Sequence, residues 1–275
     1  MTSAVMKSRR LGQARPVYPR RIVSLVPSLT ETLAQLGCAD RLVGITRHCK
    51  HPSNVAKEIE QVGGTKTLNL QKIVLLNPDL VLVNREDNRR TDIERLSRVL
   101  KVHSTFPRTA EESLHMVAEL GELLGVQAEA RLYAVRAKHT LFSLWKHVKG
   151  RRPLKAVYLI WENPYMTVNK DTYIHDLLSL GGFKNVFAGR PERYTRVTLD
   201  EIRGINPEAV FFPSEPFKFT EKHLGAFRAF QECEAVRRDN LFLMPGEPMS
   251  WPGARLHEAV EMLKDLSDKC HAEDR

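Results

Sequence analysis

The sequence predicts an α/β protein made of two Rossmann-like lobes that are joined by one long backbone helix. Two observations lead to this fold class. One motif, an amphipathic helix followed by Asn-Pro-acid and an apolar strand, occurs at residues 70–83 and again at residues 199–212. Between the two copies, residues 127–148 have helical periodicity and no internal breaker. Because the repeated unit recurs so far along the chain, we expect two lobes of one design with a helix between them.

The Asn-Pro-acid motif predicts where each helix ends and each strand begins. Proline lacks the N–H that a helix interior requires, and it moves the preceding residue out of the helical region. The two helices are therefore expected to end at Asn77 and Asn206. The four apolar residues after each acid are expected to form a buried strand.

The other elements follow in chain order. Residues 22–26 predict a strand, and Ser28 with Glu31 has the spacing of a capping box that begins the next helix. In the first lobe we also expect strands at residues 42–45 and 102–106 and helices at residues 91–100 and 111–124. In the second lobe we expect a strand at residues 157–161 and helices at residues 172–180 and 253–269.

These elements divide the chain into four parts. Residues 1–20 are expected to form a basic, mobile N-terminal arm, because they hold much of the basic charge and no periodic pattern. The N-terminal lobe is expected at residues 21–125, the linking helix at 126–150 and the C-terminal lobe at 151–275.

Composition narrows the possible functions. With 275 residues and 42% hydrophobic content, the chain can bury a core in each of two modest domains. No apolar run approaches the roughly 20 residues that span a bilayer. The net charge is +9, but no known nucleic-acid motif accompanies it, so we expect no nucleic-acid partner. Cys233 and Cys270 could pair only in an oxidising compartment.

The first residues bear on location. They lack the apolar segment of a secretory signal, so the sequence as it stands predicts a cytoplasmic protein. A longer precursor would instead predict a periplasmic one.

One glutamate occupies the same place in each copy of the repeat. Glu86 and Glu215 each stand nine residues after the motif asparagine, just beyond the predicted strand. Open α/β sheets bind their ligands and partners at that edge. Each glutamate is either a solvated loop carboxylate or a functional one. A further possibility is that the whole protein is a structural or regulatory module that binds another protein through both glutamates.

Several segments together resemble one known family. Residues 21–33, residues 37–44, the Val-Gly-Gly at residues 62–64 and the first Asn-Pro-Asp-Leu-Val strand resemble the helical-backbone (class III) periplasmic binding proteins. That family comprises solute receptors for vitamin B12, ferric siderophores, haem and some metal ions, and the resemblance is nearest to the vitamin B12-binding branch. It extends from about residue 20 to the C-terminus.

The resemblance implies a binding protein rather than an enzyme. It implies two rigid lobes with a ligand cleft between them, and a glutamate on each lobe that docks onto arginines of an ABC permease. Glu86 and Glu215 match those positions. We expect a monomer with no required cofactor and with cobalamin, a ferric chelate or a metal ion as its ligand.

Aromatic and basic side chains near the predicted strand ends are the ligand-binding candidates. Trp161 either contacts ligand or caps the core of its lobe, and the Arg193–Tyr194 loop either binds an anionic group or is plain surface. The full set of ligand-binding candidates is Trp161, Tyr165, Arg193, Tyr194, Phe217, Trp251 and Arg255.

A metal site is the remaining hypothesis. Cys49 and His51 are close in sequence, and thiolate and imidazole are both good ligands for first-row metals. The alternative is an ordinary polar loop. The alternative function for the whole chain is a cytoplasmic tetrapyrrole- or metal-handling enzyme, or a metal-binding protein, that uses the same cleft.

Overall fold

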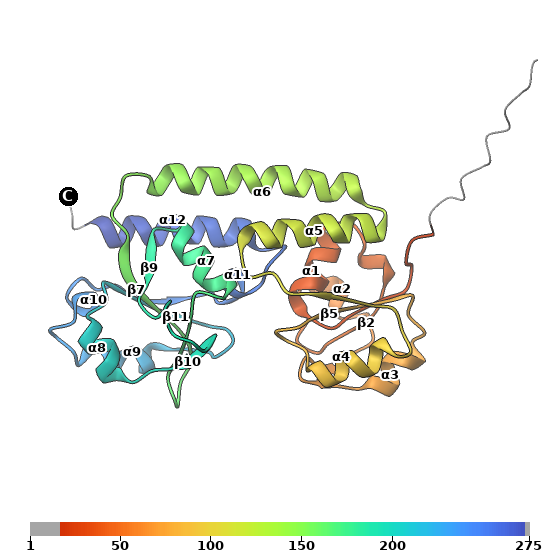
Figure 1. Ribbon diagram of the computed structural model, residues 1–275, viewed down its shortest axis with the longest axis horizontal. Helices are drawn as coiled ribbons and strands as arrows, with labels where there is room; N and C mark the ends of the chain where they lie inside the picture. The colour runs from red at the N-terminus through yellow and green to blue at the C-terminus, as the bar shows by residue number, and fades with distance from the viewer. Residues whose placement is uncertain (1–16, 273–275) are drawn as a thin grey trace, which may run out of the picture.

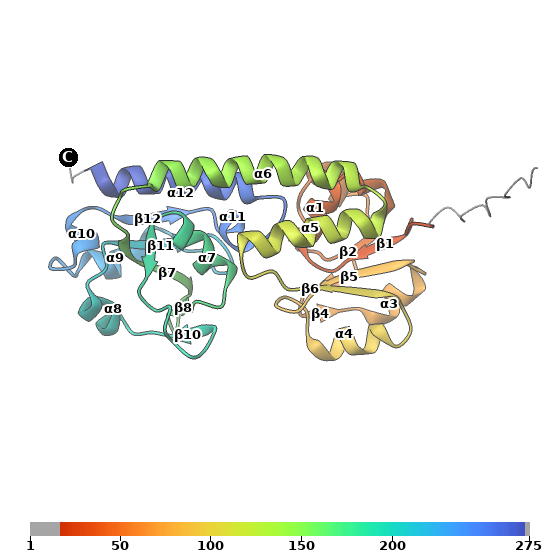
Figure 2. The same ribbon diagram turned by 45° about the horizontal axis from the view of Figure 1, so that its top comes forward.

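The computed structural model describes residues 17–272, which form two α/β lobes beneath one long helix (Figure 1). That helix is α6 (Gln127–Val148), and it lies on α5 (Ala110–Leu124) and α12 (Leu256–His271), one from each lobe. Figure 2 shows α6 outermost from a second direction. The expected linking helix and the two-lobed fold class are confirmed. Residues 1–16 of the predicted arm lie outside the described residues.

The N-terminal lobe has a parallel sheet of order β2-β1-β5-β6. Its strands are β1 (Ile22–Ser24), β2 (Leu42–Ile45), β5 (Leu80–Asn84) and β6 (Val102–Thr105). One face packs on α1 (Pro27–Gln35) and α5, and the other packs on α3 (Leu70–Leu75) and α4 (Arg90–Ser97). The lobe is completed by η1 (Ala39–Arg41), α2 (Ser53–Ala56), β3 (Gly63–Gly64) and β4 (Thr67–Leu68).

The C-terminal lobe has a mixed sheet of order β10-β8-β7-β11-β12, with β9 also paired to β7. The parallel strands are β7 (Leu154–Trp161), β9 (Phe183–Asn185), β11 (Ala209–Pro213) and β12 (Leu241–Met244), and the antiparallel ones are β8 (Met166–Val168) and β10 (Tyr194–Arg196). The helices are α7 (Tyr173–Leu180), α8 (Leu199–Ile205), α9 (Glu221–Arg228), α10 (Glu234–Arg237), α11 (Glu247–Ser250) and α12.

The repeated motif has the same structure in both lobes. Asn77 and Asn206 adopt positive φ values of 44° and 52°, which end α3 and α8. The acid that follows each proline accepts hydrogen bonds at the start of the neighbouring strand. Asp79 Oδ2 accepts from the backbone N–H groups of Arg20 and Arg21 at 2.8 and 2.9 Å. In the second lobe, Glu208 Oε2 accepts from the backbone N–H of Lys155 at 2.9 Å.

In each motif, a basic side chain also donates a hydrogen bond to the end of the helix. Arg21 donates to the carbonyl oxygen of Leu76 at 2.6 Å, and Lys155 donates to that of Ile205 at 3.3 Å. Both cations therefore satisfy carbonyl groups at the end of the preceding helix, where the helix dipole favours positive charge. The sequence repeat is thus a repeat of contacts as well as of secondary structure.

Some local expectations were wrong. Ser28 does not cap α1, because Pro27 occupies the first helical turn and Val26 is the residue before it. The strand predicted at residues 157–161 begins earlier, at Leu154, and β8, β9, β10 and β12 were missed. These short strands carry no strong alternation. Within the predicted arm, Pro19 is buried and Tyr18 lies against Gly125, so these two residues are packed rather than mobile.

The positive φ of Asn77 gives a test of the motif. We expect Asn77→Ala to lower the free energy of unfolding by about 1 kcal/mol. In the left-handed region the Cβ lies too close to the following carbonyl oxygen, and alanine lacks the polar side chain whose local hydrogen bond offsets this cost in asparagine. Asn77→Gly is the matched variant, since glycine tolerates this φ, and it should cost less than the alanine change. Chemical denaturation measures both, and equal losses would contradict the assignment of strain to this position.

Candidate functional site

A pocket of about 580 Å³ lies between the two lobes. Its walls are the segments that follow the carboxyl ends of β1, β2, β5, β7, β11 and β12, together with the start of α7. Both sheets thus present the same edge to the cleft, as expected for ligand sites of open α/β sheets. The volume falls within the roughly 300–1,000 Å³ that is usual for small-molecule sites.

Aromatic and aliphatic side chains form much of the lining. Trp161 is 43% exposed, and its ring rests edge-on against Phe217 with centroids 5.4 Å apart. The apolar part of the lining comprises Val26, Pro27, Ile160, Trp161, Met166, Tyr173, Ile174, Tyr194, Pro216, Trp251 and Pro252. Such a surface suits a large, flat or partly apolar ligand.

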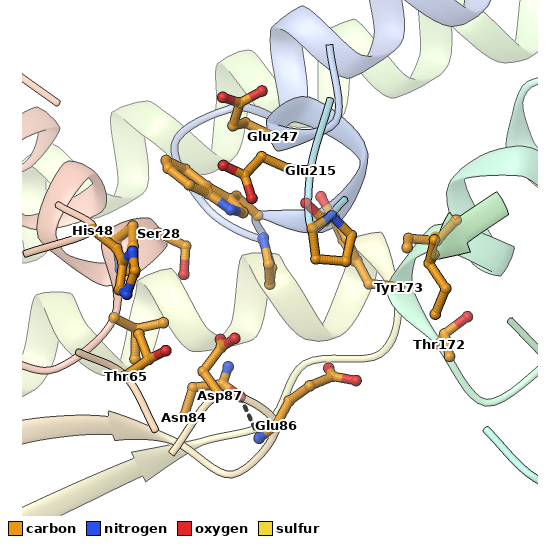
Figure 3. A pocket seen from close by; sticks show the side chains of 18 of the residues that line it. Ser28, His48, Thr65, Asn84, Glu86, Asp87, Thr172, Tyr173, Glu215 and Glu247 are labelled. Carbon is orange, nitrogen blue, oxygen red and sulfur yellow. Dashed lines mark hydrogen bonds between the residues drawn. The ribbon is translucent and has the colours of Figure 1, made fainter. Parts of the chain in front are cut away.

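Four carboxyl groups also line the pocket. Figure 3 shows Glu215 and Glu247 on one side, and Glu86 and Asp87 with Asn84 on the opposite side. Burial and the neighbouring Glu86 raise the pKa of Asp87 to about 6. Burial and Glu247 also raise the pKa of Glu215, against the opposing effect of Lys50. The protonated forms can donate hydrogen bonds as well as accept them.

Basic groups from the N-terminal lobe complete the lining. They are His48, Lys50, His51 and Lys66. Burial, with Arg47 and Lys50 nearby, lowers the pKa of His48, which keeps the imidazole neutral at pH 7. Counted as side chains, carboxyl groups outnumber ammonium groups in the pocket by two to one.

An ion pair joins the lobes at the edge of the pocket. Arg193, beside β10, donates from Nη2 to Glu86 Oε1 at 2.8 Å. Its guanidinium also lies 4.7 Å from the ring centroid of Phe106 and pairs with Asp171 at 2.7 Å. Arg108 reaches the same Asp171 carboxylate at 2.9 Å from the N-terminal lobe. The network therefore holds the two lobes in this arrangement.

Three of the seven predicted ligand-binding residues line the pocket: Trp161, Tyr194 and Trp251. The structure places the other four elsewhere. Tyr165 packs edge-on against Phe227 in the core of the C-terminal lobe, and Phe217 supports Trp161 from behind. Arg193 is engaged by Glu86.

Arg255 is likewise committed to a contact between the lobes. Its Nε donates to Glu31 Oε2 at 2.8 Å, and both side chains are only 13% exposed. The neighbouring backbone is held as well, since Ala254 N donates to Thr32 Oγ1 at 3.1 Å. Arg255 fixes the junction between the lobes rather than facing the cleft.

The expected Cys49–His51 metal site is not formed. Cys49 is 5% exposed, and its thiol lies 3.2 Å from the hydroxyl oxygens of both Thr30 and Thr46. Burial raises the pKa of this thiol, which opposes formation of the thiolate. His51, in contrast, lines the pocket. Among residues 17–272, no group of three His, Cys, Asp or Glu side chains is arranged to hold a metal ion. The four cysteines are buried and free, so Cys233 and Cys270 are not paired.

The fold and this cleft correspond to a known protein family. A family model described as periplasmic binding protein matches residues 22–248. The chain belongs to the periplasmic binding protein family. The resemblance seen in the sequence is confirmed, and the family is one of binding proteins rather than enzymes.

Relatives of this periplasmic binding protein match most of its length. The vitamin B12-binding protein of Vibrio cholerae is 25% identical over 252 residues, which cover 91% of this chain and 90% of the relative. An uncharacterized ABC transporter substrate-binding lipoprotein of Bacillus subtilis is 27% identical over 257 residues, which cover 90% and 79%. The solved periplasmic vitamin B12 binding protein of Vibrio cholerae is similar with a TM-score of 0.83 at 23% identity, over 93% of this chain and 99% of that one.

Sequence reasoning missed several pocket residues of this binding protein. His48, Lys50, Asp87 and Glu247 all follow strands at the cleft edge, and so does Glu215, which was expected at a permease interface. The strand-end rule that singled out Glu86 could have found Asp87 beside it. Charged loop residues offer no periodicity, so only their position after a strand marks them.

Asp87 gives a test of the pocket's electrostatics. Because the pKa of Asp87 is higher in the folded protein than in the unfolded chain, the folded protein binds the carboxyl proton more tightly. The free energy of unfolding should therefore fall as pH rises from about 4 to about 6. Asp87→Asn should therefore raise stability near pH 7.5 by ~1–2 kcal/mol and change it little near pH 4. Asp265→Asn, an exposed aspartate of α12, is the control.

Thermal denaturation across this pH range measures the effect. If Asp87→Asn destabilises the protein equally at both ends of the range, the carboxylate makes a favourable contact and the assignment is wrong.

Proposed function

We propose that this protein is the solute-binding component of an ABC importer and that its cleft clamps a corrinoid of the vitamin B12 type. The observation that carries the proposal is the pocket itself, which lies between two lobes and combines tryptophan, tyrosine and aliphatic walls with hydrogen-bonding groups at opposite ends. A binding protein needs shape, apolar area and a few polar anchors, and the pocket supplies all three.

Charge supports a corrinoid over an anionic chelate. Glu86, Asp87, Glu215 and Glu247 present carboxylate oxygens as acceptors, and Lys50 and Lys66 present donors. The peripheral amides of a corrinoid can pair with both kinds of group. The propionates of haem, or the charge of an anionic ferric chelate, would meet like charge in the same place.

The partner and the location rest on the relatives. The Bacillus subtilis relative is a substrate-binding lipoprotein of an ABC transporter. By analogy, we place this chain on the outer side of the cytoplasmic membrane, beside an ABC permease, rather than in the cytoplasm. Among residues 17–272, no helix has both the length and the apolar character needed to cross a bilayer.

Docking through Glu86 and Glu215 stays a prediction of the resemblance. Both side chains line the cleft, and Glu86 is bound to Arg193. A permease arginine would reach Glu86 only by replacing Arg193, which gives the pair a role in opening the cleft. We therefore propose that a permease arginine and Arg193 compete for the Glu86 carboxylate, so that docking favours opening of the cleft.

One observation favours the alternative function. An enzyme that handles a tetrapyrrole would need an acid–base group titrating near neutrality inside the cleft, and Asp87, with a pKa of about 6, has that property. If cobalamin or another corrinoid is chemically changed by the protein, and Asp87→Asn abolishes the change, the enzyme function replaces the binding one.

The chain's three tryptophans allow a matched test of the ligand site. Trp161→Ala and Trp251→Ala should each weaken cobalamin binding at least about fivefold, because each removes a wall of the pocket. The melting temperature should change little for Trp161→Ala, since its side chain is already 43% exposed. Trp145→Ala, on the outer face of α6, is the control and should bind normally.

Affinity is measured by following the corrin absorbance during titration, with haem titrated in parallel. Full affinity in both pocket variants would show that the ligand site lies elsewhere. Saturable binding of haem but not cobalamin would keep the solute-binding function and reject the corrinoid.

A further inference from the structure

The outward face of α6 exposes more large apolar side chains than any other described element. Leu132, Val135, Phe142 and Trp145 are between 50% and 67% exposed, whereas no other helix or strand within residues 17–272 exposes more than two such side chains. Exposed apolar side chains that gather on one element mark a surface for another molecule more often than scattered ones do.

These four side chains lie on one side of the helix. Their spacings of three, seven and three residues return to the same face, and they span about 20 Å of helix length. Phe142 and Trp145 stack with their ring centroids 5.6 Å apart. The opposite face of α6, with Ala130, Ala137, Thr140 and Leu144, is buried against α5 and α12. We call the exposed set the α6 stripe.

Basic groups border the α6 stripe. Lys146 lies 4.7 Å from the ring centroid of Phe142, and Lys149 lies 4.9 Å from that of Trp145. The other exposed basic side chains of the helix are Arg131, Arg136 and Lys138, and its single acid is Glu129. The residues of α6 itself, with Lys149 at its end, are therefore apolar along the centre of the stripe and cationic beside it.

We propose that the α6 stripe binds the surface of an anionic lipid bilayer. A helix with tryptophan, phenylalanine and leucine on the bound side and lysine and arginine beside them has the composition of helices that lie in a membrane interface. The aromatic rings enter the headgroup region, and the lysine and arginine side chains reach the lipid phosphates.

Other occupants fit less well. Two α6 stripes from two copies would place lysine and arginine side chains against one another. The N-terminal segment is also excluded as a cover, because residues 1–16 contain Lys7, Arg9, Arg10 and Arg15 and no acid.

The surface is separate from the ligand pocket. In both overall views α6 is the outermost helix, with α5 and α12 between it and the lobes (Figures 1 and 2). None of the α6 residues lines the pocket. Membrane contact through the stripe therefore leaves the cleft unobstructed, and its test is independent of the identity of the solute.

The experiment uses vesicles of phosphatidylcholine alone and of phosphatidylcholine with about 30% phosphatidylserine. A Trp161→Phe/Trp251→Phe variant of the full chain leaves Trp145 as the single tryptophan. We expect at least about fivefold tighter binding to the anionic vesicles, weakened by salt, with a blue shift of Trp145 emission on binding.

Charge and apolar contributions are tested separately. Lys146→Glu/Lys149→Glu should weaken binding to the anionic vesicles at least about tenfold. Phe142→Ser should weaken it several-fold and reduce the blue shift. Lys57→Glu/Lys222→Glu makes the same charge change on exposed lysines outside α6, and its loss should be much smaller. Circular dichroism and melting temperature check that each variant is folded.

Four results would overturn the proposal. One is no binding of the folded protein to anionic vesicles, and another is an equal loss in the α6 and control charge variants. The third is a dimer in sedimentation that Phe142→Ser dissociates, which would assign the stripe to a second copy. An oligonucleotide that binds the protein while anionic vesicles do not would likewise assign the stripe to nucleic acid and reject the membrane.

Discussion

The structure depends on one contact that occurs once in each lobe, between the acid of the Asn-Pro-acid motif and the backbone at the start of the neighbouring strand. Asp79 makes it to the residues before β1, and Glu208 makes it to β7. The contact sets the register of the two central parallel strands of each sheet. A slip of one residue would move every core side chain to the other face, so this register also decides which loops reach the cleft. The pocket lies where those loops meet.

The lobes are held together by different means at the two sides of the cleft. On the side of the α12 junction, Arg255 and Glu31 form a largely buried ion pair, and the backbone N–H of Ala254 is bonded to Thr32 of α1. At the opposite edge, Arg193 and Glu86 are about a quarter exposed. A partly exposed pair contributes on the order of 1 kcal/mol, which thermal motion overcomes easily. Opening of the cleft is therefore expected to break the Glu86–Arg193 pair together with the Arg108–Asp171 pair, which also joins the lobes.

Rules that depend only on neighbouring residues correctly predicted the features set by local sequence. The breaking effect of Pro78 and Pro207 and the periodicity of α6 located the repeat and the linking helix, and loop aromatics after strands located Trp161 and Trp251 in the pocket. The failures concern partners that are distant in sequence. Arg193 and Arg255 were expected to bind ligand, but each is held by a glutamate 107 or 224 residues away. The Cys49 thiol turns toward Thr30, a contact that the pattern His-Cys-Lys-His could not reveal.

The central claim is that loops from both sheets form a single ligand site. Hydrogen–deuterium exchange with and without cyanocobalamin tests it most directly. We expect ligand-dependent protection in both lobes together, at residues 26–28, 48–51, 84–87, 214–216 and 247–252, with little change on the outer face of α6. Protection confined to one lobe, or located outside these loops, would contradict the claim.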